Sequence, residues 1–486
     1  MNTPLADNSP DSLDPPDWDA FGSLAHRMLN DMLDYCHTLP ERPVWQPAPE
    51  SVRTCFQEGL PRHPTDLAAV HHDFLQNILP YAVGNGHPRF MGWVHGGGTP
   101  VGMLAEMLAA GLNANVGGRN QIPVAVEWQV VAWMRELFGF PDTASGLFVT
   151  GTSSANHQAL LVARTAALGV EARRQGLGTA GQRLTAYASA ESHVSVVSAL
   201  DYAGIGTDAL RMIPVNARYE LDVAALAAAI SRDRAAGYTP FWIVGTAGSV
   251  NVGAVDDLNA IADLAEREQV WFHIDGAYGA LALMAADLAP RLRGIERADS
   301  IACDFHKWGQ VPYDAGFLMI RDGALHQATF AAPVAYLNRQ ARGLASGGVW
   351  PCDLGIDLSR GFRALKAWFT LRVYGSDRLG EVMSTTCRLA AYLGERIEAE
   401  PRLELLAPVM LNIVCFRYRA TDPDPINAAI VMDLQESGIA APSTTLLQGR
   451  LAIRAALVNH RTTRADMDTL LAATLAIGTR LTCTNP

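Results

Sequence analysis

The chain has 486 residues, a net charge of −11 at pH 7 and 18% charged residues. A single hydrophobic core rarely extends beyond about 250–300 residues, so this length predicts two or more domains. The acidic balance, without any run of Lys and Arg, argues against a nucleic-acid partner. No apolar run approaches the roughly 18 residues of a membrane-spanning helix, so no membrane association is expected.

Seven cysteines lie far apart, and none forms a C-x-x-C pair. This pattern is typical of reduced thiols in a cytoplasmic protein and not of a disulfide framework or a zinc site. The histidines also lack the spacing of metal ligands, so no metal site is expected. Residues 1–17 are acidic and rich in proline, which predicts a loose tail and differs from a signal peptide.

Residues 1–86 are predicted to form an N-terminal arm. Apolar residues recur at helical spacing over 19–39, and a second helix is expected over 65–79. Four prolines over 40–49 require extended or irregular backbone. An arm this thin cannot enclose its own core, so we expect it to pack against a second copy of the chain in a homodimer.

A glycine-rich loop over 84–100 precedes a long alternation of strands and helices. Strands separated by helices predict a mostly parallel sheet that is covered on both faces. The expected strands are 146–149, 185–189, 211–215, 241–246, 271–274, 300–303 and 316–320. The expected helices are 101–112, 123–138, 151–170, 194–202, 223–236 and 258–268.

The C-terminal part of the chain mixes helices and strands differently, which predicts a small α+β domain. From residue 361 on, the expected helices are 361–374, 388–398, 425–436 and 464–476, and the strand-like runs are 413–418 and 451–456; the first of these helices belongs to the large domain. The expected division is therefore an arm over 1–86, a large domain over 87–375 and a small domain over 376–486.

Lys307 lies in the polar stretch Asp304-Phe305-His306-Lys307-Trp308, between two apolar strands. Burying an ammonium group costs several kcal/mol unless it is paired or chemically altered. A desolvated lysine is the usual nucleophile for imine formation. The alternative is a surface lysine on a tight turn. The neighbouring residues favour the imine.

Other polar residues follow strands of the predicted sheet, at the carboxyl ends where ligands of such sheets bind. Asp275 closes a strand and either caps the next helix or binds a protonated ring nitrogen of a cofactor, in which case small Ala277 lets a planar ring lie close. Residues 151–154 open a helix and form either an anion site or an ordinary cap. His193 is either a structural histidine or stacks on an aromatic cofactor and donates a proton.

Five sequence blocks, in order, resemble the group II pyridoxal-phosphate-dependent decarboxylases, the family of aromatic-L-amino-acid and glutamate decarboxylases. The blocks are HPRF (87–90), TGTSSANHQALLVAR (150–164), HIDGAYG (273–279), DFHKW (304–308) and SRGFRALKAWFTLRVYG (359–375). The resemblance spans about residues 20–475. It implies the α/β architecture of fold-type I pyridoxal-phosphate enzymes, decarboxylation of an L-amino acid, and a homodimer with active sites at the subunit interface.

The resemblance also implies roles for single residues. Lys307 would form an imine with pyridoxal 5'-phosphate, Asp275 would bind the pyridinium nitrogen beside Ala277, and His193 would stack on the ring. Tyr336 matches the tyrosine of a mobile loop that closes over the neighbouring subunit's site and returns a proton to the carbon left by CO2.

The cofactor phosphate would be held by Ser153 and Ser154, with Asp304 and His306 near the cofactor. Two positions depart from the family pattern. The aromatic branch commonly has Asn at the position of Asp304, and an acid near a phosphate leaves its role open, for instance in orienting loop amides. Val250 stands where many members have Thr, which removes one hydroxyl near the cofactor.

The expected substrate pocket combines Trp93, His95 and Gly96 of the glycine-rich loop with Asn115 and Gly117 from the second subunit. The last two positions are bulkier and apolar in the aromatic branch, and residues 96–98 leave room here. The expected substrate is an aromatic amino acid, with an acidic or other polar amino acid as the alternative.

Three further alternatives concern the reaction. A decarboxylation-dependent aldehyde synthase often replaces the loop tyrosine or the stacking histidine, and both are present here. A fold-related aminotransferase or carbon–sulfur lyase would not need Tyr336 or the His306-Lys307-Trp308 stretch. A non-catalytic scaffold is disfavoured because Lys307, Asp275 and His193 are all intact.

Overall fold

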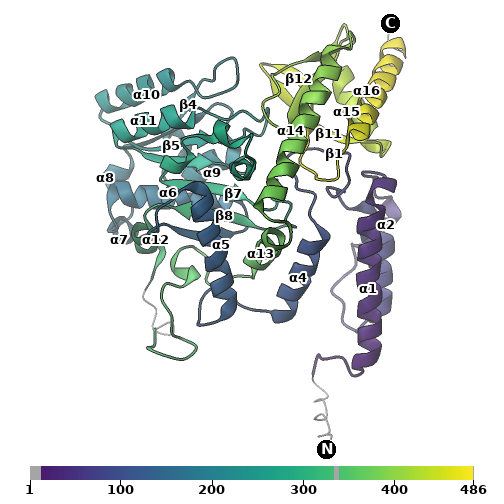
Figure 1. The fold of residues 1–486 in the computed structure, drawn as a ribbon, viewed down its shortest axis with the longest axis horizontal. Helices are drawn as coiled ribbons and strands as arrows, with labels where there is room; N and C mark the ends of the chain where they lie inside the picture. Colours follow the sequence, from purple (N-terminus) through teal and green to yellow (C-terminus); the bar gives the residue numbers. More distant parts are fainter. Residues whose placement is uncertain (1–11, 333–338, 485–486) are drawn as a thin grey trace, which may run out of the picture.

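The larger of two sheets forms the centre of the molecule. The computed structural model describes residues 12–332 and 339–484 (Figure 1). The seven strands of the sheet run in the order β2-β8-β7-β6-β5-β3-β4. They are β2 (Ser145–Val149), β3 (Leu184–Ser189), β4 (Leu210–Ile213), β5 (Thr239–Thr246), β6 (Trp271–Asp275), β7 (Ser300–Asp304) and β8 (Gly316–Ile320). Only β8 runs antiparallel to its neighbours, so the predicted mostly parallel sheet is confirmed.

Helices cover both faces of this sheet, so alternate side chains of one strand enter different cores. On β5, Ile243 packs in one hydrophobic cluster, while Trp242 and Val244 pack in another. Burial on both faces explains why these strands read as nearly continuous apolar runs. The helices of this part of the chain are α4 (Pro100–Leu112), which packs on α13, then α5 (Ile122–Phe138), α6 (Thr152–Leu168), α7 (Ala172–Gln175), α8 (Gly178–Gly181), α9 (Val194–Tyr202), α10 (Val223–Ala235), α11 (Leu258–Glu268), α12 (Gly323–Phe330) and α13 (Arg363–Tyr374).

The N-terminal arm stands at one side of the molecule in Figure 1. It comprises α1 (Trp18–Thr38), α2 (Glu50–Cys55) and α3 (Leu67–Asp73), and α1 has no buried residue. The second predicted helix is shorter than expected, because the chain widens into a π-helical turn over Phe74–Ile78. Pro80 follows at once and lacks the N–H that a continuing α-helix needs.

The smaller sheet has the strand order β1-β11-β12-β10-β9. Its strands are β1 (Phe90–Met91), β9 (Leu403–Leu405), β10 (Ile413–Tyr418), β11 (Ala441–Leu447) and β12 (Arg450–Ala456), with helices α14 (Ser376–Glu398), α15 (Pro423–Glu436) and α16 (Arg464–Thr484). This is the expected α+β unit, and α14 begins twelve residues before the predicted start at 388. The domain boundaries stay predictions, although β1 pairs in parallel with β11 and so belongs to this sheet. Within 12–332 and 339–484, no helix has both the length and the apolar character needed to cross a membrane.

Candidate active site

The polar residues singled out in the sequence meet at one edge of the large sheet. Asp275 is the last residue of β6, and Lys307 follows β7, which is parallel to β6. The first turn of α6 touches both places, because Thr152 N donates to Asp304 Oδ1 (2.8 Å) and Asn156 Nδ2 donates to Asp275 Oδ2 (3.0 Å). The carboxyl ends of parallel strands are the usual ligand site of such sheets.

Asp304 binds the amine of Lys307 directly. Lys307 Nζ lies 3.0 Å from Asp304 Oδ2, and the two side chains are 23% and 2% exposed. The other carboxylate oxygen accepts the Thr152 N–H at the positive end of α6. The cation and the helix end therefore both stabilise the buried carboxylate. Lys307 is not a surface lysine on a turn.

His306 supports this pair from the side of β8. Its Nδ1 accepts the Ala315 N–H at 3.0 Å, and its Nε2 lies 3.6 Å from Asp304 Oδ2. Burial lowers the pKa of His306, and the charge of Asp304 partly opposes this effect. Because Nδ1 is an acceptor, the neutral ring carries its proton on Nε2, on the side of Asp304.

Asp275 is 4% exposed and accepts two N–H groups. Ala277 N donates to its Oδ1 (3.2 Å), and Asn156 Nδ2 donates to its Oδ2 (3.0 Å). The first contact is a local turn and not the predicted alternative, a helix cap, because the next helix begins at Ala280 and has Gly279 as its N-cap. The second contact comes from a different helix and is not a capping interaction. The two N–H donors give each oxygen of this buried carboxyl group a hydrogen-bond partner.

His193 is the N-cap of α9, and its side chain is exposed. The Ser195 N–H donates to His193 Nδ1 (3.2 Å), and Ser195 Oγ lies 2.7 Å from the same nitrogen. Asn156 Nδ2 also donates to Ser195 Oγ (3.1 Å). A hydrogen-bonded chain thus links His193 to Asp275.

Sequence reasoning missed three members of this chain: Asn156, Ser195 and His273. Each is buried, and His273 Nε2 lies 2.9 Å from Asn156 Oδ1. Burial lowers the pKa of His273 to about 3, so its ring is neutral. Asn156 lies one helical turn before Leu160 and Ala159, so its position on the buried face was the available signal, because a buried amide requires partners.

The start of α6 has the polar groups of an anion site. Thr152 Oγ1 is buried and has no hydrogen-bond partner among the described residues. Ser153 is exposed at the helix end, whereas Ser154 Oγ already accepts from Gln158 Nε2 (3.0 Å). Backbone N–H groups at a helix N-terminus favour a phosphate.

These groups fit pyridoxal phosphate. A lysine amine, a carboxylate at a neighbouring strand end and a helix N-terminus with an unpaired hydroxyl suit the aldehyde, the ring nitrogen and the phosphate of that molecule. The half-buried Ala277 adds little bulk beside Asp275. Among residues 12–332 and 339–484, no group of three His, Cys, Asp or Glu side chains is arranged for a metal ion.

Aromatic rings of the glycine-rich loop lie near Lys307. His95 stacks on Trp93 (5.5 Å between ring centroids) and on Phe90 (5.7 Å), and it meets the edge of the Tyr313 ring (5.9 Å). Burial lowers the pKa of His95, and the charge of Lys307 adds to this effect. Trp93 is 52% exposed.

One expectation about the substrate pocket is wrong. Gly96 leaves no room, because a Cβ on it would lie 2.3 Å from the His306 carbonyl oxygen; the glycine allows backbone to approach backbone. Asn115 is exposed, and its Oδ1 accepts from Gly117 N (2.9 Å) and Arg360 N (3.0 Å). Its place in the pocket of a second subunit stays a prediction.

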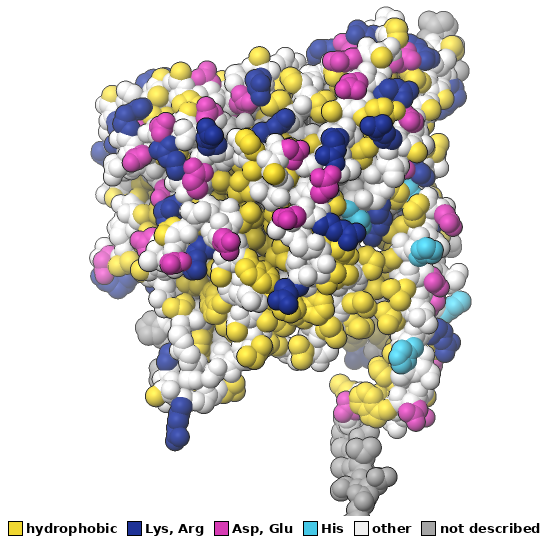
Figure 2. All heavy atoms as spheres, in the orientation of Figure 1, with side chains coloured by type: hydrophobic (Ala, Val, Ile, Leu, Met, Phe, Trp, Pro, Cys, Tyr) yellow, Lys and Arg dark blue, Asp and Glu magenta, His cyan; other side chains and the backbone are white. Residues whose placement is uncertain are grey.

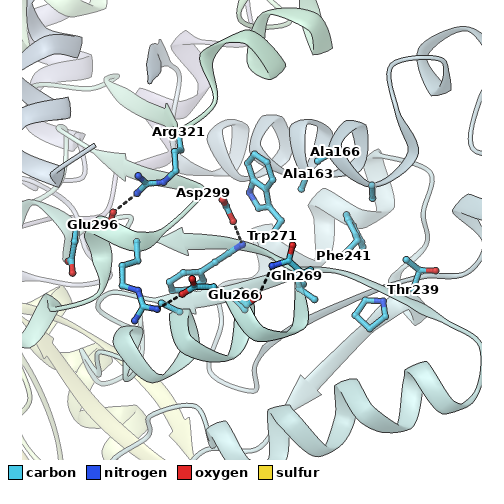
Figure 3. Close-up of a pocket in the computed structure, with 17 residues that line it drawn as sticks. Ala163, Ala166, Thr239, Phe241, Glu266, Gln269, Trp271, Glu296, Asp299 and Arg321 are labelled. Carbon is cyan, nitrogen blue, oxygen red and sulfur yellow. Dashed lines mark hydrogen bonds and ion pairs between the residues drawn. The ribbon is translucent and has the colours of Figure 1, made fainter. Parts of the chain in front are cut away.

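Figure 3 shows a pocket of about 670 Å³ that lies at the opposite edge of the sheet. Thr239, Trp271 and Asp299 line it at the amino ends of β5, β6 and β7. Its charged groups already have partners: Arg297 pairs with Glu266, and Asp299 accepts the Phe272 N–H. It is not the site of Lys307.

Comparisons with known proteins agree with this geometry. The pyridoxal-dependent decarboxylase conserved domain matches residues 49–419. Aromatic-L-amino-acid decarboxylase of Bacillus atrophaeus is 32% identical over 91% of this chain and 92% of its own length. L-2,4-diaminobutyrate decarboxylase of Rhizobium meliloti (strain 1021) is 32% identical over 84% of this chain and 81% of its own length. A crystal structure described as Oryza sativa TDC with PLP and tryptamine shares the fold, with a TM-score of 0.89, 24% identity, and coverage of 97% of this chain and 100% of that one.

The predicted fold-type I architecture and the predicted cofactor, pyridoxal phosphate, are thereby confirmed. The predicted loop tyrosine, Tyr336, lies outside the described residues. The family match covers most of the chain, including the blocks around Lys307 and Asp275. The chain belongs to the pyridoxal-dependent decarboxylases and is an amino acid decarboxylase.

Proposed function

We propose that this enzyme converts an aromatic L-amino acid to its amine and CO2. The observation that carries the aromatic assignment is the cluster of Phe90, Trp93, His95 and Tyr313 beside Lys307. Flat rings in this position favour a flat apolar side chain, through stacking worth about 0.5–1.5 kcal/mol beyond area burial. The relative from Bacillus atrophaeus supports the same class.

The site residues divide the work as follows. Pyridoxal phosphate supplies a ring that accepts the electrons released when the carboxylate leaves. Lys307 would hold the cofactor through its amine. Asp275 would pair with the ring nitrogen, and His193 would contact the ring. Ser153, Ser154 and the free hydroxyl of Thr152 bind the phosphate.

Asp304 and His306 act on the lysine. The Asp304 carboxylate lies 3.0 Å from the Lys307 amine and accepts the first N–H of α6. His306 packs against the same carboxylate. The acid at this position therefore orients Lys307 and the helix end. The sequence alone left the role of Asp304 open, because the aromatic branch of the family commonly has Asn at this position.

The alternative substrate is a polar amino acid, and a specific observation favours it. The diaminobutyrate decarboxylase is as similar to this chain, at 32% identity, as the aromatic relative. A cationic side chain would lie against the Trp93 and Tyr313 rings through cation–π contacts.

A panel of amino acids tests the function. The purified holoenzyme is incubated with tryptophan, tyrosine, phenylalanine, 2,4-diaminobutyrate and glutamate, while CO2, amine, keto acid and aldehyde are measured. We expect equal amounts of amine and CO2, with the highest kcat/KM for an aromatic substrate. Keto acid without CO2 would identify an aminotransferase, and aldehyde in place of amine would identify an aldehyde synthase.

Tyr336 is proposed as the proton donor to the carbon that loses CO2. Because general acids contribute about 10²–10⁴-fold, Tyr336→Phe is expected to lower amine formation at least about tenfold and to raise the carbonyl product relative to the amine. Chromatography of both products measures the ratio. An unchanged ratio would remove Tyr336 from this role.

A homodimer is proposed from the exposed apolar surface. Figure 2 shows hydrophobic side chains gathered over the region of α4, α5 and α13, in the lower centre of the view. The exposed residues include Leu112, Ile122 and Leu344, at 62%, 76% and 67%. A monomer seldom leaves so much apolar surface to water. Light scattering is expected to give twice the 52.3 kDa of one chain, and a mass of one chain would refute the dimer.

The free cysteines also support the proposed cytoplasmic location.

A further inference from the structure

The strongest unexplained feature is a directed chain of hydrogen bonds that crosses β6 behind Asp275. It begins at Trp271, whose Nε1 donates to Ser300 Oγ (2.8 Å). Ser300 Oγ lies 2.8 Å from His273 Nδ1, and His273 Nε2 lies 2.9 Å from Asn156 Oδ1. Asn156 Nδ2 then reaches Asp275 Oδ2 at 3.0 Å. Of these groups only Trp271 is partly exposed.

The chemistry of the two ends fixes the direction of every bond. An indole N–H can only donate, so Ser300 Oγ accepts from Trp271. The Asn156 carbonyl oxygen only accepts, so His273 carries its proton on Nε2, and its Nδ1 accepts from Ser300 Oγ. At the other end, the Asp275 carboxylate accepts only, so the Asn156 amide must present its N–H groups to it. The reverse amide orientation would place two acceptors against each other.

The Asn156 amide can adopt only one orientation in this arrangement. It is fully buried, and both N–H groups are used, one by Asp275 and one by Ser195 Oγ (3.1 Å). A buried network whose members are all satisfied is rigid and polarised along its length. Each donation strengthens the next, and the last one ends on the carboxylate.

We propose that Asn156 is a positioning residue for Asp275: its amide, oriented by His273, holds the carboxylate in place. The inference rests on the proposed function, in which Asp275 faces the cofactor ring nitrogen. The N–H of Ala277 stays on the other carboxylate oxygen whatever residue stands at 156. Of the two hydrogen bonds to Asp275, the one from Asn156 is therefore the one that a substitution of the donor side chain removes.

The sharpest variant is Asn156→Asp, which keeps the size and removes both N–H groups. Two carboxyl groups about 3 Å apart share one proton at low pH and repel each other once it is lost. The titratable groups around this position are Asp275, His273 and His193, with Asp304 and Lys307 beyond Thr152. They are common to the variant and the parent enzyme, so the ratio of their cofactor affinities isolates the change.

The test titrates the apoenzyme with pyridoxal phosphate across pH and follows protein fluorescence. We expect Asn156→Asp to bind the cofactor about tenfold or more weakly than the parent, with a deficit that grows as pH rises. Asn156→Ala removes the donor without adding a charge, so its deficit is expected to be independent of pH. A parent-like affinity in Asn156→Asp at every pH would overturn the proposal.

A matched control separates this effect from general damage by a buried acid. Asn427 is another fully buried amide, bound to Tyr418 in the small domain, so Asn427→Asp makes the same chemical change far from Asp275. We expect it to lower the thermal midpoint and to leave the affinity ratio unchanged. An affinity loss equal to that of Asn156→Asp would also overturn the proposal.

A charge exchange provides a second measurement. Combining Asn156→Asp with Asp275→Asn restores one donor facing one acceptor but moves the carboxylate away from the ring. The apoenzyme is expected to recover the thermal midpoint lost in Asn156→Asp, while kcat stays low. No recovery would contradict the pairing. A parent enzyme that releases no CO2 would instead refute the proposed function, whatever these binding ratios are.

Discussion

Lys307→Ala is expected to abolish turnover and to remove the visible absorbance of the lysine-bound cofactor. The reason is chemical, because no other amine is available at the site. The sequence contains only two lysines, and the second, Lys366, is 2% exposed and paired with Glu106 on α4. The spectrum of the purified variant and its CO2 release measure the result.

The scarcity of lysine also gives a direct mapping experiment. Borohydride reduction of the holoenzyme fixes the cofactor to its lysine, and peptide mass spectrometry locates it. We expect the label on Lys307 alone. Lys366→Arg, which keeps the charge beside Glu106, serves as the control and is expected to retain the visible absorbance. Labelling of Lys366, or activity in Lys307→Ala, would contradict the assignment.

The largest effect on stability is expected at the buried ion pair between Arg360 and Glu127. Arg360 Nη2 meets Glu127 Oε1 at 2.6 Å, and both side chains are 1% exposed. Arg360 also donates to the carbonyl of Phe148, and Glu127 accepts the Phe148 N–H (3.1 Å). Removing one partner leaves a buried charge uncompensated, so Arg360→Met is expected to cost about 3–5 kcal/mol in free energy of unfolding.

Urea unfolding of the apoenzyme, followed by circular dichroism, measures this cost. Arg174→Met is the control, because Arg174 and Glu171 form a pair with side chains 74% and 66% exposed; it is expected to change the free energy by less than about 1 kcal/mol. The double variant Glu127→Leu with Arg360→Met is expected to recover part of the loss. Equal losses of unfolding free energy in Arg360→Met and Arg174→Met would contradict the larger contribution expected of the buried pair.

Local patterns allowed much of the fold to be predicted. β8 and β10 have the predicted bounds, because each is a short apolar run between turn residues. β1 and β11 were not predicted as strands. β1 has two residues and pairs with a segment 351 positions away, as Phe90 faces Ala441. Pro442 in β11 also argues locally against a strand. Such long-range pairing leaves no local signal.

The site shows the same limit. The structure places Lys307, Asp304 and the start of α6 together, as the ends of parallel strands predict. The role of Asn156 was not predictable, because its partners on β6 and α9 come from distant parts of the sequence. Glycine at 96 was interpreted as open space, although the missing side chain lets the loop touch the backbone of His306. Sequence cannot distinguish these two uses of glycine.

The pairing of β1 with β11 has a consequence for how the enzyme is made. The loop that carries Trp93 and His95 begins at β1, and Arg454 Nη1 of β12 donates to the Trp93 carbonyl (2.9 Å). During synthesis, residues 90–95 emerge some 350 residues before the strands that hold them. The nascent chain can complete the large sheet, with Lys307 and Asp275 in place, before the strands that hold β1 have been synthesised. The pairing of β1 is therefore a late step of folding, possible only after the C-terminal strands have left the ribosome.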